Sequence, residues 1–286
     1  MPGIIVTGPP RSGTSATARL LGLSGLHSAV SDDLVGGGPN NPTGHWESKT
    51  VLAINNQLLE AAECRWWCPP PPGGLVGAPD LAATAQSAFD CVHPASPWVC
   101  KDPRFASTLS FWRPLLGDGV ACLILARRPD EVVQSLRRTW PISVDHAAAL
   151  WARALHGSLA VSAGMPAGFV RFPEILANPR LLVAQLAHDL AATDVPVTLA
   201  GPSVDEVAQF VRPPQGATDV GDELPSYAWD LWDHICAAVG ISVEFLPALV
   251  EDESVERTLS PLREALRAGH PLDMRPTFAR STSPAG

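Results

Sequence analysis

Short, wholly apolar runs alternate along the chain with longer segments in which apolar residues recur every three or four positions. The apolar runs predict buried β-strands over residues 3–7, 98–100, 120–126 and 168–171. The periodic segments predict helices over residues 14–23, 47–63, 81–89, 146–162 and 180–191, and Pro129 opens one more. Strands that alternate with helices predict an α/β fold of three layers, in which helices flank a central, mostly parallel sheet.

Residues beyond about position 196 have a weaker pattern. Residues 229–239 and 253–267 have helical spacing, and the last dozen residues have the composition of a tail. No internal repeat is visible in the sequence. We therefore expect a single domain over residues 1–270, followed by a flexible C-terminal tail over residues 271–286.

The charge balance limits the classes of partner. The chain has 286 residues, with 20 Lys and Arg against 29 Asp and Glu, and a formal net charge of −9. This acidic balance argues against nucleic acid, whereas a small anionic ligand is compatible with it because the local field at a site matters more than the net charge. No signal peptide is visible and the apolar runs have the length of strands, so we expect no transmembrane segment and a cytoplasmic protein.

The six cysteines are sparse for a chain of this length, which indicates reduced thiols rather than disulfides. Cys64 and Cys68 are four positions apart without a neighbouring histidine, so we expect no metal site there. Only two lysines occur, Lys49 and Lys101, in a composition rich in Ala, Arg and Pro. That composition is typical of proteins from GC-rich bacterial genomes.

The chain runs from the first predicted strand into the first predicted helix through the sequence Gly8-Pro9-Pro10-Arg11-Ser12-Gly13-Thr14-Ser15. Backbone N–H groups in such a turn point at one spot, where the helix dipole favours negative charge. Arg11 adds a forked cation suited to phosphate or sulfate. The alternative interpretation is a turn that only connects the two elements.

The same segment differs from the phosphate-binding loop of nucleoside triphosphatases, Gly-x4-Gly-Lys-[Ser/Thr]. Gly8 and Gly13 have the required spacing, and Ser15 occupies the position of the magnesium-binding hydroxyl, but Thr14 stands where the lysine would be. The loop geometry is therefore kept while the lysine for the triphosphate is lost.

This segment resembles the 5′-phosphosulfate-binding loop of the sulfotransferase superfamily, in which Pro-(Lys/Arg)-Ser-Gly-Thr follows the first strand. The resemblance implies a P-loop-like fold and, as sulfuryl donor, 3′-phosphoadenosine 5′-phosphosulfate. It also implies a set of donor-binding residues in the loop: Pro10, Arg11, Ser12, Gly13, Thr14 and Ser15. No metal is implied.

A second element of that family is an Arg at a strand end and a Ser eight residues later, which hold the 3′-phosphate of the donor. Arg127 and Ser135 match this pattern after the apolar run 120–126. An arginine supplies a charge-assisted, bidentate contact to a phosphate. The alternative is a surface arginine and a serine on a helix face.

Three further segments resemble bacterial sulfotransferases. Residues 41–47 are similar to their Asn-Pro-x-Gly-(aromatic)-(aromatic)-Glu segment, with His45 at an aromatic position, and residues 101–104 match their Lys-Asp-Pro-Arg motif. Residues 169–179 are similar to their strand followed by Tyr-Glu-Asp-Leu-Leu, although Phe172-Pro173-Glu174 departs from it. The resemblance covers roughly residues 3 to 190 and implies a bacterial sulfotransferase.

Candidate catalytic residues follow from the demands of sulfuryl transfer, which needs in-line geometry and stabilisation of the leaving phosphate. We expect Arg11 to meet the charge of that phosphate, and Lys101 to contact the sulfuryl group or the leaving oxygen. Pro103 stands where the cytosolic eukaryotic branch has a histidine base, so the base is open among four residues: Glu47, His45, Asp32 and Asp33. Glu47 is favoured because it closes a recognisable motif; the alternative is a carboxylate that stabilises the first turn of a helix.

The sequence therefore predicts a sulfotransferase whose acceptor is a hydroxyl or amine of a small molecule, glycan or lipid. A nucleotide or small-molecule kinase with the same loop geometry is the runner-up, and Thr14 argues against it. A catalytically silent nucleotide-binding module is a third class, which the retained Arg11, Arg127 and Ser135 argue against. The oligomeric state cannot be read from the sequence.

Overall fold

A computed structural model describes residues 1–38, 41–73, 75, 78–202, 206–207, 209–211, 220–237, 241–242, 251–270 and 272–274. In this part of the chain, one sheet has the strand order β2-β1-β3-β4-β5. Its strands are β1 (Gly3–Thr7), β2 (Trp98–Lys101), β3 (Val120–Ala126), β4 (Ala167–Arg171) and β5 (Ile241–Ser242). The first four pair in parallel, and β5 joins β4 antiparallel.

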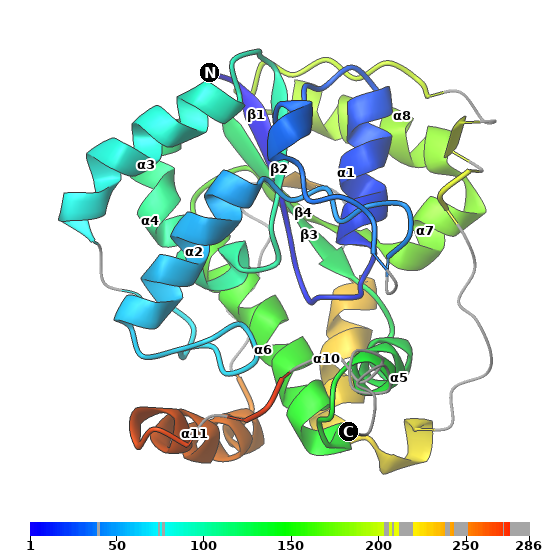
Figure 1. Ribbon diagram of the computed structural model, residues 1–286. Coiled ribbons are helices and arrows are strands. Elements are labelled where there is room, and N and C mark those ends of the chain that lie inside the picture. The colour runs from blue at the N-terminus through cyan, green and yellow to red at the C-terminus, as the bar shows by residue number, and fades with distance from the viewer. Residues whose placement is uncertain are drawn as a thin grey trace, which may run out of the picture.

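Helices cover this sheet on both sides (Figure 1). They are α1 (Thr14–Leu23), α2 (Lys49–Ala61), α3 (Pro79–Val92), α4 (Phe105–Leu116), α5 (Pro129–Thr139), α6 (Val144–Ser162), α7 (Phe172–Ala177), α8 (Pro179–Ala191), α10 (Ser226–Ala237) and α11 (Glu253–Arg267). Short 3-10 turns span Ser31–Asp33 and Gly221–Glu223. The predicted three-layer α/β fold with a mostly parallel sheet is confirmed. None of the described helices is long and apolar enough to cross a membrane.

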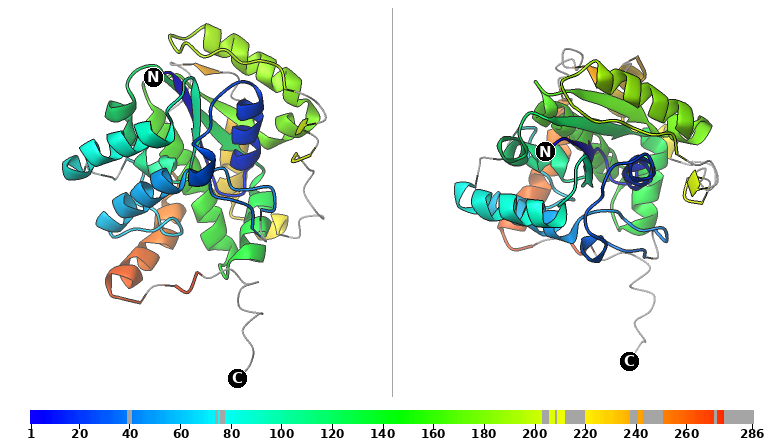
Figure 2. Two further views of the ribbon diagram at one scale, coloured as in Figure 1. Left: turned by 45° about the horizontal axis from the view of Figure 1, so that its top comes forward. Right: turned by 90° about the horizontal axis from the view of Figure 1, so that it is seen from above.

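The alternation of side chains along the central strand divides the core into two layers. Cys122 and Ile124 of β3 pack with the layer formed by α2 to α6, α10 and α11. Leu123 and Leu125 pack with the layer formed by α1, α7 and α8. Figure 2 shows the two layers on opposite sides of the sheet. All seven residues of β3 are buried, as expected for a strand covered on both faces.

The strand predictions hold to within one residue, and most helices begin or end within a few residues of the predicted bounds. The helix predicted over residues 47–63 begins later, at Lys49, because Ser48 caps it by accepting from the Val51 amide at 3.1 Å. The helix predicted over 229–239 starts at Ser226, and residues 238–239 lie outside the described residues. Most of the predicted tail, residue 271 and residues 275–286, also lies outside them.

Two helices were not predicted. Helix α4 has apolar residues at helical spacing, but Pro114 in its last turns is a signal against a helix interior. Helix α7 follows β4 at once, and its Glu174 carboxylate accepts from the Arg171 amide at 3.0 Å, which fixes its start.

The four parallel strands place their carboxyl ends at one edge of the sheet. Three segments with candidate chemistry leave the sheet there: the loop after β1, Lys101 at the end of β2 and Arg127 directly after β3. Ligands of open α/β sheets bind outside this edge. The topology therefore brings the predicted site residues together.

Candidate functional site

The loop after β1 depends on two glycines. Gly8 has φ 125° and Gly13 has φ 97°, in the region that L side chains rarely adopt. A Cβ on Gly8 would lie 2.4 Å from the Leu125 carbonyl oxygen, and a Cβ on Gly13 would lie 2.4 Å from the Phe172 ring. The loop can pack this closely against β3 and α7 only because glycine stands at both positions.

Arg11 also has a positive φ, 72°, which is uncommon for a residue with a side chain. Such a conformation costs on the order of 1 kcal/mol or more and is concentrated at functional sites. The Arg11 Nε donates to Ser135 Oγ at 3.0 Å. Burial and the neighbouring Arg127 both lower the pKa of Arg11. Arg11 of the loop and Arg127 at the end of β3 therefore place two cations close together in a partly buried position.

The N-terminus of α1 lacks a side-chain cap, unlike those of α2, α6 and α8. Its N-cap residue is Gly13, and the first-turn amides have no acceptor within the helix. The side chain of Ser12 is buried and donates to the Pro9 carbonyl at 2.5 Å, so it stabilises the turn itself. The arrangement leaves the helix N-terminus open to an anion.

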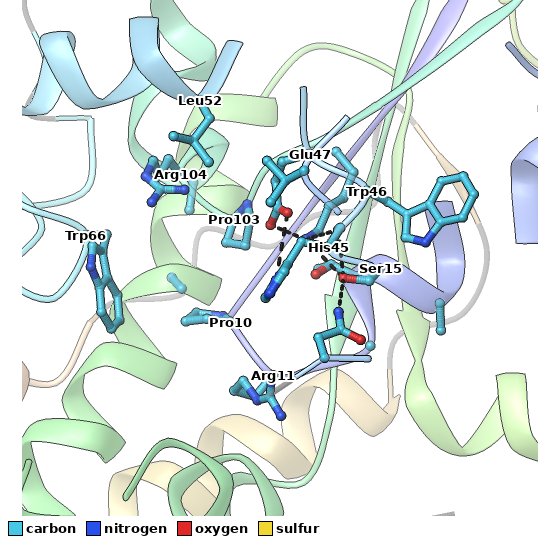
Figure 3. A pocket seen from close by; sticks show the side chains of 18 of the residues that line it. Pro10, Arg11, Ser15, His45, Trp46, Glu47, Leu52, Trp66, Pro103 and Arg104 are labelled. Atoms are coloured by element: carbon cyan, nitrogen blue, oxygen red, sulfur yellow. Dashed lines mark hydrogen bonds and ion pairs between the residues drawn. The ribbon is translucent and has the colours of Figure 1, made fainter. Parts of the chain in front are cut away.

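Lys101 connects the loop to the segment that precedes α2. Its side chain is 3% exposed and forms an ion pair with Glu47 Oε1. It also donates to Ser15 Oγ at 3.2 Å and to the His45 carbonyl at 3.1 Å. Ser15 Oγ in turn donates to the same His45 carbonyl at 2.9 Å. Figure 3 shows Ser15, His45 and Glu47 grouped in the centre of the cavity.

Glu47 is the buried carboxylate of this group, with a side chain 9% exposed. Its Oε1 pairs with Lys101, whereas its buried Oε2 has no hydrogen-bond partner. His45 Nδ1 lies 4.0 Å from that oxygen. Burial lowers the pKa of His45; Glu47 opposes this, and Lys101 and Arg11 reinforce it. His45 is therefore neutral near pH 7, and Glu47 Oε2 is a buried acceptor without a donor, which is rare in folded proteins.

The other two candidate bases have different roles. Asp33 accepts from Ser48 Oγ, from the Thr50 amide at 3.1 Å and from Thr50 Oγ1 at 2.7 Å, so it fastens the start of α2. Asp32 is exposed, and its backbone carbonyl accepts from Lys49 at 2.9 Å. Neither aspartate lines the cavity described below.

Arg127 occupies the end of β3, held from three sides. Its Nε donates to Glu131 Oε2 at 2.6 Å, its Nη1 donates to the Arg11 carbonyl at 3.1 Å, and its guanidinium lies 4.6 Å from the centre of the Phe172 ring. Ser135 is occupied by Arg11 rather than by Arg127. Arg127 and Ser135, the pair predicted to hold the 3′-phosphate, therefore both contact Arg11 of the loop, and the Glu131 carboxylate occupies Arg127.

The motif Lys101-Asp102-Pro103-Arg104 is anchored by Asp102, which is fully buried. Asp102 accepts from Asn55 Nδ2 at 3.0 Å and from the Arg104 amide at 2.8 Å, and it pairs with the Arg104 guanidinium at 3.1 Å. Asn55 Oδ1 accepts from Thr108 Oγ1 and Trp112 Nε1, both at 2.8 Å. This satisfied network fixes the end of β2 to α2 and α4, and so positions Lys101.

One cavity of about 680 Å3 unites these residues. The predicted site residues that line it are Pro10, Arg11, Gly13, Thr14, Ser15, His45, Glu47, Lys101 and Arg127. Ser12 and Ser135 lie behind this lining, where they support the loop and Arg11.

Several lining residues were missed from the sequence. The Arg19 guanidinium lies 4.4 Å from the Phe210 ring centre and 5.6 Å from that of Trp46, so three flat groups are gathered beside the loop. Arg153, on α6, also lines the cavity. No local spacing signals these residues, because helix α1, helix α6 and residue 210 meet only in the folded chain.

The described residues include no group of three or more His, Cys, Asp or Glu arranged to hold a metal ion. All six cysteines have unpaired thiols, and burial raises the pKa of Cys68 and of Cys122 to about 12. Neither cysteine is suited to act as a thiolate nucleophile at neutral pH.

The fold and site together define an α/β protein in which the glycine-containing loop after β1, two arginines and a buried carboxylate line one cavity. No protein-family model and no curated protein sequence matches the chain. A solved structure that is similar is the sulfotransferase domain from the Synechococcus PCC 7002 olefin synthase, with 16% identity, a TM-score of 0.37, and coverage of 91% of this chain and 93% of that one. This degree of likeness is too low to assign an activity, which depends on the residues of this chain alone.

Proposed function

We propose that the protein is a sulfotransferase that moves a sulfuryl group from 3′-phosphoadenosine 5′-phosphosulfate to a hydroxyl or amine. One observation carries the proposal. The uncapped N-terminus of α1, the cations Arg11 and Arg127, and Glu47, a buried carboxylate with one unpartnered oxygen, all lie at one cavity of about 680 Å3. An anionic donor and a protic acceptor are the two reactants that such a set of groups would bind.

The donor half of the site is the loop with Arg11 and Arg127. Loop amides and Arg11 would bind the 5′-phosphosulfate. Arg127 would bind the 3′-phosphate together with Ser135, whose Oγ now accepts from Arg11 Nε and would have to turn its hydroxyl to the phosphate. Glu131 now holds Arg127 at 2.6 Å, so a phosphate has to replace that carboxylate. The aromatic faces of Trp46 and Phe210, which now contact Arg19, suit a planar base.

The chemical roles follow from the same geometry. The acceptor oxygen forms a bond to sulfur while the bond from sulfur to the 5′-phosphate oxygen breaks, and the acceptor proton goes to Glu47 Oε2. Arg11 and the amides of α1 stabilise the charge that develops on the leaving phosphate. Each such preorganised donor is typically worth about 3–4 kcal/mol of barrier. Lys101 orients Glu47 and lies next to the reacting oxygen atoms.

The kinase alternative would need a cation after Gly13 to hold the β- and γ-phosphates. Thr14 occupies that position, and Lys101 is already bound to Glu47, Ser15 and His45. These contacts favour a donor with one phosphosulfate over a triphosphate.

Calorimetry with 3′-phosphoadenosine 5′-phosphate tests the proposal. We expect this bisphosphate to bind more tightly than ATP with magnesium. Tighter binding of magnesium-ATP would contradict the proposal and favour the kinase alternative.

A further inference from the structure

The side of the cavity remote from the donor loop has a distinct lining. We call it the aromatic half, and its residues are Leu52, Leu59, Trp66, Pro69, Trp140 and Leu150. Trp66 and Trp140 lie 4.8 Å apart between ring centres at an angle of 58°, so they form a corner rather than a stack. Figure 3 shows Trp66 and Leu52 on one side of Glu47, and Trp46 on the other. The carboxylate therefore lies between the two halves of the cavity.

Two cations that line the cavity, Arg153 and Arg104, are neutralised by the protein's own carboxylates. Arg153, with a side chain 2% exposed, pairs with Glu251 and Glu256, both at 2.6 Å. Its Nη1 donates to the Pro70 carbonyl at 2.8 Å. Arg104 pairs with Asp102 at 3.1 Å, and its Nε donates to the Asn56 side chain at 2.8 Å. A negatively charged acceptor would have to compete with these carboxylates.

The walls of the aromatic half also disfavour carbohydrate. A sugar exposes several hydroxyl groups, each of which loses water on binding and needs a partner. Leucine, proline and tryptophan side chains form this lining, and Arg104, Ser107 and Arg153 are among the polar residues that also line the cavity. An apolar molecule replaces water there without such a cost, and an aromatic body gains from the indole rings.

We propose that the acceptor is an uncharged alcohol with an apolar, ring-containing body, bound against Trp66 and Trp140 with its hydroxyl directed at Glu47. The inference rests on the proposed sulfotransferase function and narrows its acceptor class. Trp66 and Trp140 determine specificity in this scheme, and Glu47 takes the proton.

Calorimetry on the protein saturated with 3′-phosphoadenosine 5′-phosphate tests this inference with three probes: 2-naphthol, 6-hydroxy-2-naphthoate and methyl glucoside. We expect 2-naphthol to bind at least about tenfold more tightly than either of the others. Trp140→Ala should weaken 2-naphthol about tenfold and leave the nucleotide affinity unchanged. Trp140→Leu keeps the site apolar and should reduce the affinity for 2-naphthol by a smaller factor. It replaces the alanine variant in the test if that variant does not fold. Trp229→Ala is the matched control, because Trp229 packs 5.5 Å from Arg128 and does not line the cavity.

Equal or tighter binding of methyl glucoside or of the naphthoate overturns the acceptor class, as does 2-naphthol binding that Trp140→Ala leaves unchanged. The proposed function fails separately. If the bisphosphate nucleotide does not bind, but 2-naphthol binds the nucleotide-free protein in a way that depends on Trp140, the ligand class is supported and the sulfotransferase assignment is lost.

Discussion

Two buried ionic groups border the same cavity and differ in how completely they are satisfied. Arg153, with a side chain 2% exposed, has a partner on every side: Glu251, Glu256 and the Pro70 carbonyl. Glu47, with a side chain 9% exposed, has Lys101 on one oxygen and no hydrogen bond on the other. The two groups have similar burial, yet only the second leaves a polar atom unpaired.

This difference suggests a structural role for the Arg153 cluster and a chemical role for Glu47. Arg263 extends the satisfied cluster, since it pairs with Glu256 and donates to the Pro69 carbonyl at 3.0 Å. The cluster thus ties α11 and the segment with Pro69 and Pro70 to α6. A buried carboxylate oxygen without a donor costs free energy and contributes nothing to such a framework. Glu47 lines the cavity, and in the proposed reaction this oxygen accepts the proton of the substrate.

The largest expected effect is on Glu47. Glu47→Gln should lower turnover about 10²- to 10⁴-fold, the range for loss of a general base, while sparing donor affinity. Turnover kinetics together with calorimetry of the bisphosphate nucleotide measure the two quantities. Glu60→Gln, a control on the exposed side of α2, should change neither. Unchanged turnover in Glu47→Gln would assign the base to His45.

The next effect concerns a buried polar group away from the cavity. Both ring nitrogens of His93 are buried without hydrogen bonds in the described structure, and the ring stacks on Phe89 at 4.5 Å. Burial lowers its pKa from 6.5 to about 4, against a smaller opposing effect of Asp33. Between pH 6.5 and 4, His93 is therefore protonated in the unfolded chain but largely neutral in the folded chain. Stability should fall by roughly 3 kcal/mol as the pH drops from 6.5 to 4.

Urea unfolding at a series of pH values measures this loss. His93→Phe should flatten the slope between pH 6.5 and 4, because it removes the titrating group and keeps the ring contact. His234→Phe is the control, since His234 lies on the exposed side of α10. A slope that survives in His93→Phe would show that another group is responsible.

The satisfied cluster is tested by Glu251→Gln, which weakens one of the two ion pairs of Arg153. We expect a loss of about 2 kcal/mol in the free energy of unfolding, the scale of a hydrogen bond to a charged group. Nucleotide affinity should not change. Glu253→Gln is the control: Glu253 is exposed at the first residue of α11, and its substitution should hardly change the free energy of unfolding. A lower nucleotide affinity in Glu251→Gln would contradict the purely structural role of the Arg153 cluster.

The smallest effect is expected at Arg127. This residue lines the cavity, as Glu47 does, but it also has an internal carboxylate partner, Glu131, as Arg153 has Glu251 and Glu256. Arg127→Ala should weaken 3′-phosphoadenosine 5′-phosphate about tenfold, as loss of one charge-assisted contact predicts, and hardly affect adenosine 5′-phosphosulfate, which lacks the 3′-phosphate. Glu131→Gln should act in the opposite direction, because it removes the competing carboxylate. Equal losses for both nucleotides would exclude Arg127 from the 3′-phosphate site.

Much of the framework could be predicted from local sequence. The glycines at positions 8 and 13 predicted the turn, and the apolar run 120–126 predicted the central strand. Parallel strands bring their carboxyl ends to one edge, so the meeting of Lys101 and Arg127 with the loop also followed. Helix α4 was missed although Phe105, Leu109 and Trp112 have helical spacing, since Pro114 is a signal against helix.

The partners within the site could not be predicted, because each depends on contacts between distant segments. Glu47 was expected at a helix start, yet its side chain turns to Lys101 and α2 begins after it. Ser135 was expected beside Arg127, but Arg11 takes its hydroxyl. No local pattern encodes Arg153 as a lining residue, since its neutralising carboxylates lie about a hundred positions later.

The contacts of Lys101 have a consequence for mutational studies. One ammonium group holds Ser15 of the donor loop together with His45 and Glu47 of the opposite segment. Substitutions at Ser15 and Glu47 therefore share a partner, and their effects should not add in a double-mutant cycle. A substitution that alters the loop would also alter the environment of the carboxylate, so the two proposed substrate sites are expected to evolve as one epistatic unit.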